Sequence, residues 1–127
     1  RIGGVLLLAQ MSSSGNLLTA DYTDEVIATG GGSPNVIGFI GNGSSSEEVA
    51  ALRAKVGDSQ MIWTPGVNLA VGDGDMGQRY GHPREAVLAG SDAIIVGSGI
   101  HRADSRRDAA AEYARASFEA LCEREGQ

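Results

Sequence analysis

Four short runs of consecutive apolar residues recur along the chain, and polar segments with helical spacing separate them. The runs cover residues 5–9, 36–40, 61–63 and 93–96. Continuous apolar runs of this length predict strands that are buried on both faces, as in parallel sheets. The spacing of the runs leaves room for one helix after each strand.

The intervening segments carry the start and stop signals of helices. Thr19 or Asp21 is expected to cap the first helix, Pro83 suits the first turn of the third, and Asp104 is expected to cap the last. The expected helices span about 19–28, 46–57, 83–90 and 104–121. The apolar stripe expected on the last helix consists of Ala110, Tyr113, Ala114, Ser117, Phe118 and Leu121.

The resulting order is strand–helix four times over, which predicts an α/β fold with a parallel sheet and helical crossovers. A doubly wound sheet and a β/α barrel both fit this alternation. The chain has 127 residues, whereas a complete eight-stranded barrel needs about 250. If the chain is barrel material, it is about half a barrel.

Charge and cysteine content exclude several classes of partner. The net charge of −6 argues against sequence-independent binding to nucleic acid or to an anionic membrane, since both require basic patches. No apolar stretch reaches the ~20 residues of a membrane span. Cys122 is the single cysteine, so an internal disulfide and a cysteine metal site are not expected. We therefore expect a reducing, cytoplasmic setting.

The polar residues that follow the strands are the candidates for ligand binding, because parallel α/β folds bind ligands at the carboxyl ends of their strands. The turn at Gly97, Ser98 and Gly99 exposes backbone N–H groups suited to phosphate, or it is merely a structural turn. The serines at 12–14 are ligand donors or a polar approach to a helix. Gln78 and Tyr80 end a glycine-rich loop and offer further donors.

Taken in order, these segments resemble the orotidine 5′-phosphate decarboxylase family of fungi and animals. The matching stretches are LLLAQMSSSGNL (6–17), DYT (21–23), VIGFI (36–40), TPGV (64–67), GDxxGQxY (74–75 and 77–80) and GSDAIIVGxGI (90–100, with Ser98 at x). The family fold is a (β/α)8 TIM barrel. The resemblance implies that residues 1–127 are its C-terminal half, strands five to eight, and that the N-terminal catalytic half is absent from this chain.

The resemblance also implies a role for specific positions in binding orotidine monophosphate or UMP. Ser12 would hydrogen-bond the pyrimidine ring, and Pro65 would wall the apolar side of the pocket. Gln78 would bridge the ring carbonyl and the phosphate, and Tyr80 would donate to the phosphate. The backbone of Gly97 and Ser98 would cradle the phosphate. The family needs no cofactor or metal, so neither is expected here. The family also forms homodimers, so an oligomer is expected.

Two departures from the family pattern bear on activity. The family usually carries an arginine where Ser98 stands, and a serine hydroxyl cannot replace a bidentate guanidinium. Arg79 and Arg102 are interpreted as surface charges, although either is close enough in sequence to reach the phosphate. The catalytic lysines and aspartates of the family have no counterpart, because Lys55 is the only lysine and lies in an expected outer helix. We therefore expect no catalytic residue in this chain.

Three functions follow from the sequence. The first is orotidine 5′-phosphate decarboxylase, converting orotidine monophosphate to UMP and CO2 once the N-terminal half completes the barrel. The second is another phosphate-binding barrel lyase on the same scaffold. The third is a non-catalytic binding or assembly module derived from the enzyme, which the serine at position 98 favours.

Overall fold

The fold is that of a computed structural model, which describes residues 3–74 and 77–126. Asp75, which belongs to the GDxxGQxY motif, lies outside the described residues. None of the described helices is long and apolar enough to cross a membrane.

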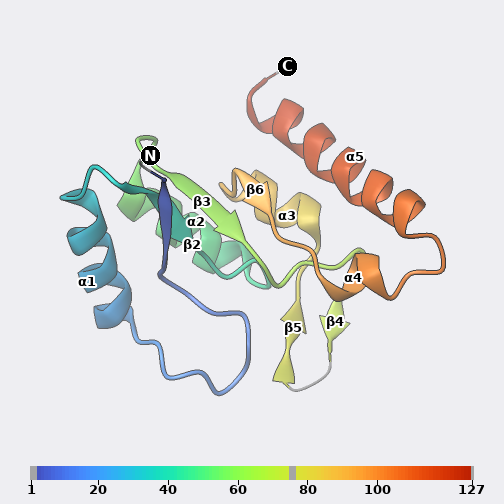
Figure 1. The fold of residues 1–127 in the computed structure, drawn as a ribbon, viewed down its shortest axis with the longest axis horizontal. Coiled ribbons are helices and arrows are strands. Elements are labelled where there is room, and N and C mark those ends of the chain that lie inside the picture. The colour runs from blue at the N-terminus through green and yellow to red at the C-terminus, as the bar shows by residue number, and fades with distance from the viewer. Residues whose placement is uncertain (1–2, 75–76, 127) are drawn as a thin grey trace.

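A parallel sheet forms the centre of the molecule (Figure 1). Its strands are β1 (Val5–Leu8), β2 (Val36–Ile40), β3 (Met61–Thr64) and β6 (Ala93–Ile94), which lie side by side in chain order. A doubly wound sheet reverses its strand order at a switch point. The sequential order therefore agrees with the barrel expectation and decides between the two architectures that the alternation left open.

Five helices accompany the strands among the described residues: α1 (Ala20–Gly31), α2 (Ser46–Val56), α3 (Pro83–Leu88), α4 (Ser98–His101) and α5 (Arg106–Arg124). The Thr19 hydroxyl caps α1 by accepting a hydrogen bond from the Tyr22 amide, as expected. The last helix begins later than the sequence suggested, because Ser105 rather than Asp104 accepts from the Asp108 amide. The short helix α4 was not foreseen as a separate element.

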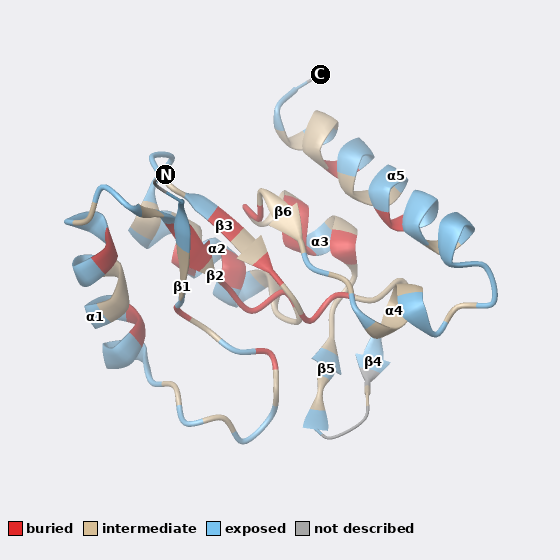
Figure 2. Ribbon diagram, in the orientation of Figure 1, coloured by how far each residue is buried: buried red, intermediate tan, exposed pale blue. Residues whose placement is uncertain are grey.

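The hydrophobic core lies between the sheet and the helices that cover one of its faces (Figure 2). Phe39 and Ile62 project from neighbouring strands and meet Leu52 of α2, and all three side chains are almost completely buried. Val26 and Ile27 of α1 pack against the same cluster. The helices α1 and α2 thus bury their apolar sides on this face of the sheet, whereas α5 packs on α3.

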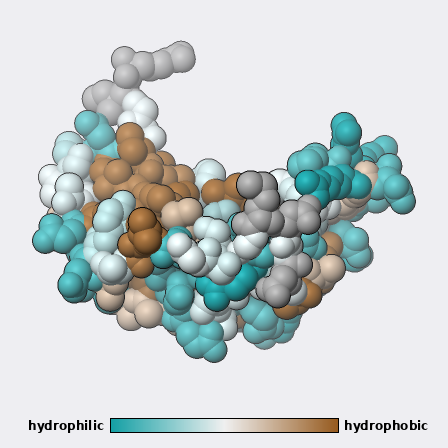
Figure 3. All heavy atoms as spheres, turned by 90° about the horizontal axis from the view of Figure 1, so that it is seen from below, coloured by the Kyte–Doolittle hydropathy of each residue, from teal (hydrophilic) through white to brown (hydrophobic). Residues whose placement is uncertain are grey.

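The opposite face of the sheet is apolar and is left partly uncovered by the described residues. Leu8, Ile40 and Trp63 are neighbours in one row across the strands and lie on the face away from Phe39 and Ile62, because successive side chains alternate. Leu8 is 42% exposed. Figure 3 shows hydrophobic side chains gathered beside a hollow of the surface. The outer edges of β1 and β6 also have no strand partner among the described residues.

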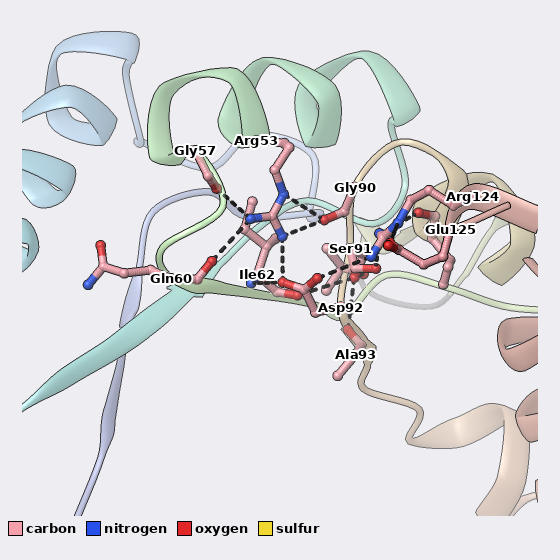
Figure 4. A network of polar contacts seen from close by, with 12 residues as sticks. Arg53, Gly57, Gln60, Ile62, Gly90, Ser91, Asp92, Ala93, Arg124 and Glu125 are labelled. Atoms are coloured by element: carbon pink, nitrogen blue, oxygen red, sulfur yellow. Dashed lines mark hydrogen bonds and ion pairs between the residues drawn. The ribbon is translucent and has the colours of Figure 1, made fainter. Parts of the chain in front are cut away.

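An ionic network joins helices and strands at the amino ends of the strands (Figure 4). Asp92 accepts hydrogen bonds from Arg53 of α2, from Arg124 of α5 at 3.3 Å and from the Ile62 amide at 2.8 Å. The Arg53 guanidinium also donates to the carbonyl of Gly90. The Asp92 carboxylate therefore links the helices α2 and α5 to the strand β3.

Two features depart from the sequence expectations. The glycine-rich loop expected up to Tyr80 lies in the segment 67–81, which contains a two-stranded antiparallel hairpin of β4 (Gly72–Asp73) and β5 (Arg79–Tyr80). The stripe expected on the last helix is only partly buried: Tyr113 is 4% exposed, but Phe118 is 66% exposed. Ala120, outside the expected stripe, is fully buried, because α5 faces α3 with a side rotated away from that stripe.

Candidate functional site

The segments after β1, β3 and β6 converge at the carboxyl ends of the strands (Figure 1). The hairpin of β4 and β5 extends from this end and lies along the segment that follows β1. An isolated bridge between Ser13 and Gln78 joins the two. Every residue that the sequence nominated for ligand binding lies in these three segments.

Ser12 and Gln78 are in direct contact although they are far apart in the sequence. The Gln78 side-chain amide donates to the Ser12 hydroxyl at 2.6 Å and to the Arg79 carbonyl at 2.8 Å. Ser12 is only 6% exposed. The contact places a hydroxyl and an amide side by side. Together these groups can hydrogen-bond to the polar edge of a ligand ring.

The turn after β3 packs closely against Ser12. Gly66 has a φ of +78°, and a Cβ at this position would lie 2.4 Å from the Ser12 Cβ. Only glycine tolerates both the backbone conformation and the approach. The preceding Pro65 is half-buried, and its carbonyl accepts a hydrogen bond from the Gly43 amide at 2.9 Å. The structure therefore brings Pro65 and Ser12 into one neighbourhood.

A second contact joins the hairpin to the turn after β6. The Tyr80 and Ser98 hydroxyls lie 3.1 Å apart. Ser98 is the first residue of α4 and Gly97 is its N-cap. The N–H groups of Ser98 and Gly99 come before the first hydrogen bond of this helix, which the Ile100 amide donates to the Gly97 carbonyl at 3.1 Å. The Tyr80 hydroxyl and these N–H groups therefore lie together as potential donors to an anion.

The hairpin is fixed against the first segment by further hydrogen bonds. The amide and the hydroxyl of Ser14 both donate to the Gly77 carbonyl, at 2.9 and 3.0 Å. Because Gln78 and Tyr80 lie two residues apart on an extended strand, they point to the same side. One short strand thus carries both the residue that meets Ser12 and the residue that meets Ser98.

Basic residues lie mostly outside this arrangement. The Arg79 Nε donates to the Ser12 carbonyl at 3.5 Å, at the other end of the hairpin contact from Ser98. Lys55 pairs with Asp24 on the outer surface between α2 and α1, as the sequence suggested. His101 is exposed at the end of α4. Within the described ranges, no three histidine, cysteine, aspartate or glutamate side chains are grouped as metal ligands.

The sequence interpretation missed a buried polar network behind the site. Asn42, which is fully buried, donates from its side chain to the Glu48 carboxylate at 2.8 Å. The Gln10 side chain accepts a hydrogen bond from the backbone N–H of Asn42 at 2.9 Å and donates one to the backbone carbonyl of Glu48 at 3.1 Å. The signal was present, since a polar residue stands two positions after the end of each of the buried strands β1 and β2. The network fixes the segment after β1 to the start of α2.

Comparisons with known proteins identify the family of the chain. The Orotidine 5'-phosphate decarboxylase / HUMPS family model matches residues 2–113. The chain is 40% identical over 112 residues to orotidine 5'-phosphate decarboxylase of Aureobasidium pullulans, covering 86% of this chain and 38% of that protein. It is 38% identical over 121 residues to uridine 5'-monophosphate synthase of Bos taurus, covering 94% of this chain and 23% of that protein.

The solved structures lead to the same family. The orotidine 5'-phosphate decarboxylase of Pyrococcus horikoshii superposes with a TM-score of 0.73 at 28% identity, over 91% of this chain and 51% of that one. The Sulfolobus solfataricus enzyme superposes with a TM-score of 0.69 at 26% identity, over 93% of this chain and 50% of that one. The chain thus spans about half of these structures and less than half of the curated relatives. With four parallel strands in barrel order and a match over most of its length, the chain belongs to the Orotidine 5'-phosphate decarboxylase / HUMPS family.

Proposed function

We propose that the chain supplies the phosphate- and pyrimidine-binding half of an orotidine 5′-phosphate decarboxylase. The complete protein would convert orotidine monophosphate to UMP and CO2 in pyrimidine biosynthesis, without a cofactor or a metal. The observation that carries the proposal is the position of one strand, β5 with the residue before it. Its Gln78 is hydrogen-bonded to Ser12 and its Tyr80 to Ser98.

The two contacts are consistent with a nucleoside monophosphate, which has a polar ring at one end and an anion at the other. The Ser12 and Gln78 pair offers hydrogen bonds to the ring, and the half-buried Pro65 offers an apolar surface beside it. Tyr80 with the backbone of Gly97 and Ser98 offers donors to the phosphate. In this proposal Gln78 is the link between the two ends, since it lies between Ser12 and Tyr80.

The chemical step would come from residues outside this chain. Lys55 is the only lysine, and it is paired with Asp24 on the outer surface. We therefore propose that an N-terminal half with the family's lysines and aspartates packs on the uncovered face around Leu8 and Trp63. The completed barrel is expected to form a homodimer and to be cytoplasmic.

Ligand titration tests the binding half of the proposal. The chain has one tryptophan, Trp63, on the uncovered face, so its fluorescence reports events at the sheet without labelling. UMP, uridine and ribose 5-phosphate are titrated separately, with calorimetry as the second method. Tighter binding of UMP than of either fragment supports the proposal, because both ends of the ligand are then recognised. Equal affinity for ribose 5-phosphate and UMP would instead favour another phosphate-binding barrel lyase.

Intact mass spectrometry of the purified material tests whether a catalytic half is present. A second species with a lysine–aspartate motif, or a chain of about twice this length, agrees with the decarboxylase proposal. A single species of 13.1 kDa that turns over orotidine monophosphate would contradict the assignment of catalysis to the other half.

A non-catalytic binding or assembly module is the second candidate, and one observation favours it. Position 98 carries a serine whose hydroxyl is engaged with Tyr80 rather than a guanidinium free to meet a phosphate. Absence of UMP binding at millimolar ligand, in protein that is folded by circular dichroism, would make this candidate the better one.

A further inference from the structure

Tyr113 connects the last helix to the segment that carries the hairpin. It lies on α5, is 4% exposed, and its hydroxyl accepts a hydrogen bond from the Leu69 amide at 3.2 Å. Its backbone carbonyl accepts from the Ser117 hydroxyl at 2.8 Å within the same helix. A buried tyrosine hydroxyl normally finds such a partner, and here the partner belongs to a segment 44 residues away.

The same hydroxyl lies against the turn after β6. A Cβ on Gly99 would lie 2.2 Å from the Tyr113 hydroxyl oxygen and 2.9 Å from the ring carbon that carries it. No larger residue fits at position 99 without displacing the tyrosine or the turn. Tyr113 therefore touches two segments at once, the start of the 67–81 segment and the first turn of α4.

Leu69 is placed where it can orient the hairpin. Residues 66–68 are already tied to Gly81, since the Asn68 amide donates to the Gly81 carbonyl at 2.9 Å and the Gly81 amide donates to the Gly66 carbonyl at 3.0 Å. Leu69 is the next residue outward, before β4 begins. The contact with Tyr113 therefore fixes the direction in which the hairpin leaves its base.

We propose that Tyr113 is a positioning residue that holds the hairpin and the phosphate turn in one relative orientation, so that Tyr80 meets position 98. The proposal rests on the proposed function, because it assigns Tyr113 an effect on the phosphate end of the ligand only. Tyr113 itself does not touch the ligand in this proposal. The Ser12 and Gln78 end is tied to the first segment by its own hydrogen bonds through Ser14.

The test compares Tyr113→Phe with Tyr22→Phe in the purified protein. Tyr22 is 41% exposed on α1, so its substitution controls for loss of a tyrosine hydroxyl elsewhere. Hydrogen exchange followed by NMR measures how fast the Leu69 amide proton exchanges with solvent. This rate is expected to rise about five- to tenfold in Tyr113→Phe, which is the effect of losing one neutral hydrogen bond. The Tyr22→Phe variant is expected to leave that amide unchanged.

The ligand readout distinguishes positioning from a merely structural role. Tyr113→Phe is expected to weaken UMP binding about five- to tenfold and to leave uridine binding unchanged. Equal losses for UMP and uridine would overturn the proposal, as would an unchanged Leu69 amide. If even the wild-type protein binds no UMP, the proposed function fails, whereas the exchange measurement still decides whether Tyr113 fixes the segment.

A double-mutant cycle with Gly99→Ala provides a second test of the contact. Gly99→Ala alone forces a methyl group against the tyrosine hydroxyl and is expected to speed exchange at Leu69. In the Tyr113→Phe background the same substitution is expected to have a smaller further effect, because the closest clashing atom is gone. Strictly additive effects would show that the two residues act separately and would refute the shared contact.

Discussion

The Tyr80 hydroxyl lies 3.1 Å from the Ser98 hydroxyl and joins the hairpin strand β5 to the first residue of α4. Either hydroxyl can be the donor, and the hydrogen bond between them uses only one of the two protons, so the pair keeps one donor for an anion. The family usually has an arginine at position 98, which donates but cannot accept. An arginine there would add charged, bidentate donors for a phosphate, which the serine hydroxyl does not supply.

Ser98→Arg is therefore expected to tighten UMP binding by about ten- to a hundredfold, the effect of one charge-assisted hydrogen bond to a phosphate. Uridine binding should be unchanged, since uridine has no phosphate. Calorimetric titration of both ligands makes the comparison. Ser59→Arg adds the same charge on an exposed residue just before β3, at the opposite end of the sheet, and should tighten neither ligand. A similar gain in Ser59→Arg would mean that net charge alone is responsible.

Gly66→Ala is expected to abolish binding of the ring end of the ligand. Its Cβ would lie 2.4 Å from that of Ser12, so Ser12 and its contact with Gln78 must shift. Gly57→Ala is the matched control, because Gly57 also has a positive φ, +69°, but a Cβ there meets nothing within 4 Å. Each variant should lose about 1–3 kcal/mol of unfolding free energy. Only Gly66→Ala should lose uridine affinity. A comparable loss in Gly57→Ala would contradict the explanation by a clash with Ser12.

Asp92→Asn is expected to lower the free energy of unfolding by about 1–3 kcal/mol, because two arginines lose a shared, partly buried carboxylate. The side chains of Arg53 and Asp92 are 19% and 27% exposed. Asp24→Asn removes the partner of Lys55 from a pair whose side chains are 44% and 57% exposed. That control should cost less than about 1 kcal/mol. Urea unfolding measures both, and equal costs would contradict a special role for Asp92.

Glu47 predicts a small pH dependence of stability. A hydrogen bond with its own backbone N–H, and next one from the Ser45 hydroxyl, hold the pKa of this exposed carboxyl below its ordinary 4.5. A pKa that is lower in the folded state stabilises the protein above pH 4.5 and loses this effect as the pH falls through the folded value. The difference in Tm between wild type and Glu47→Gln should therefore be largest near neutral pH and shrink in acid. A difference that is constant across this range would contradict the prediction.

Most of the fold follows from local sequence signals, and the departures have physical causes. The apolar runs located all four strands of the sheet, because a strand buried on both faces tolerates few polar residues. The last run extended to Val96, but β6 ends at Ile94 because its partner β3 ends at Thr64, just before Pro65. Strand length is therefore set by the neighbour, which the run itself does not encode.

The hairpin was not foreseen because its strands are only two residues long and lie in a segment rich in glycine. They lack the alternation that marks a strand, and their pairing depends on contacts with Ser13 and Ser14. Long-range contacts of this kind also explain why Tyr113 was interpreted only as part of an apolar stripe. Its ring fitted the helical spacing, but the partner of its hydroxyl lies 44 residues away.

The site residues were nominated by resemblance, and the structure brings them together as two pairs. Ser12 with Gln78 and Tyr80 with Ser98 are contacts that no spacing rule would have paired. Their roles towards a ligand stay predictions until titrations are made. Asp92, by contrast, was matched only as part of a family motif, and its link to Arg53 and Arg124 depends on where three elements meet.

The ionic network around Asp92 lies at the amino ends of the strands, whereas all the nominated ligand residues lie at the carboxyl ends. Substitutions of the nominated ligand residues therefore leave this network untouched. Selection can act on ligand preference at one end while the ionic network at the other end is kept. A replacement such as the serine at position 98 can then persist in a folded chain, and the same separation makes this half-barrel a tolerant starting point for evolving recognition of other anionic ligands.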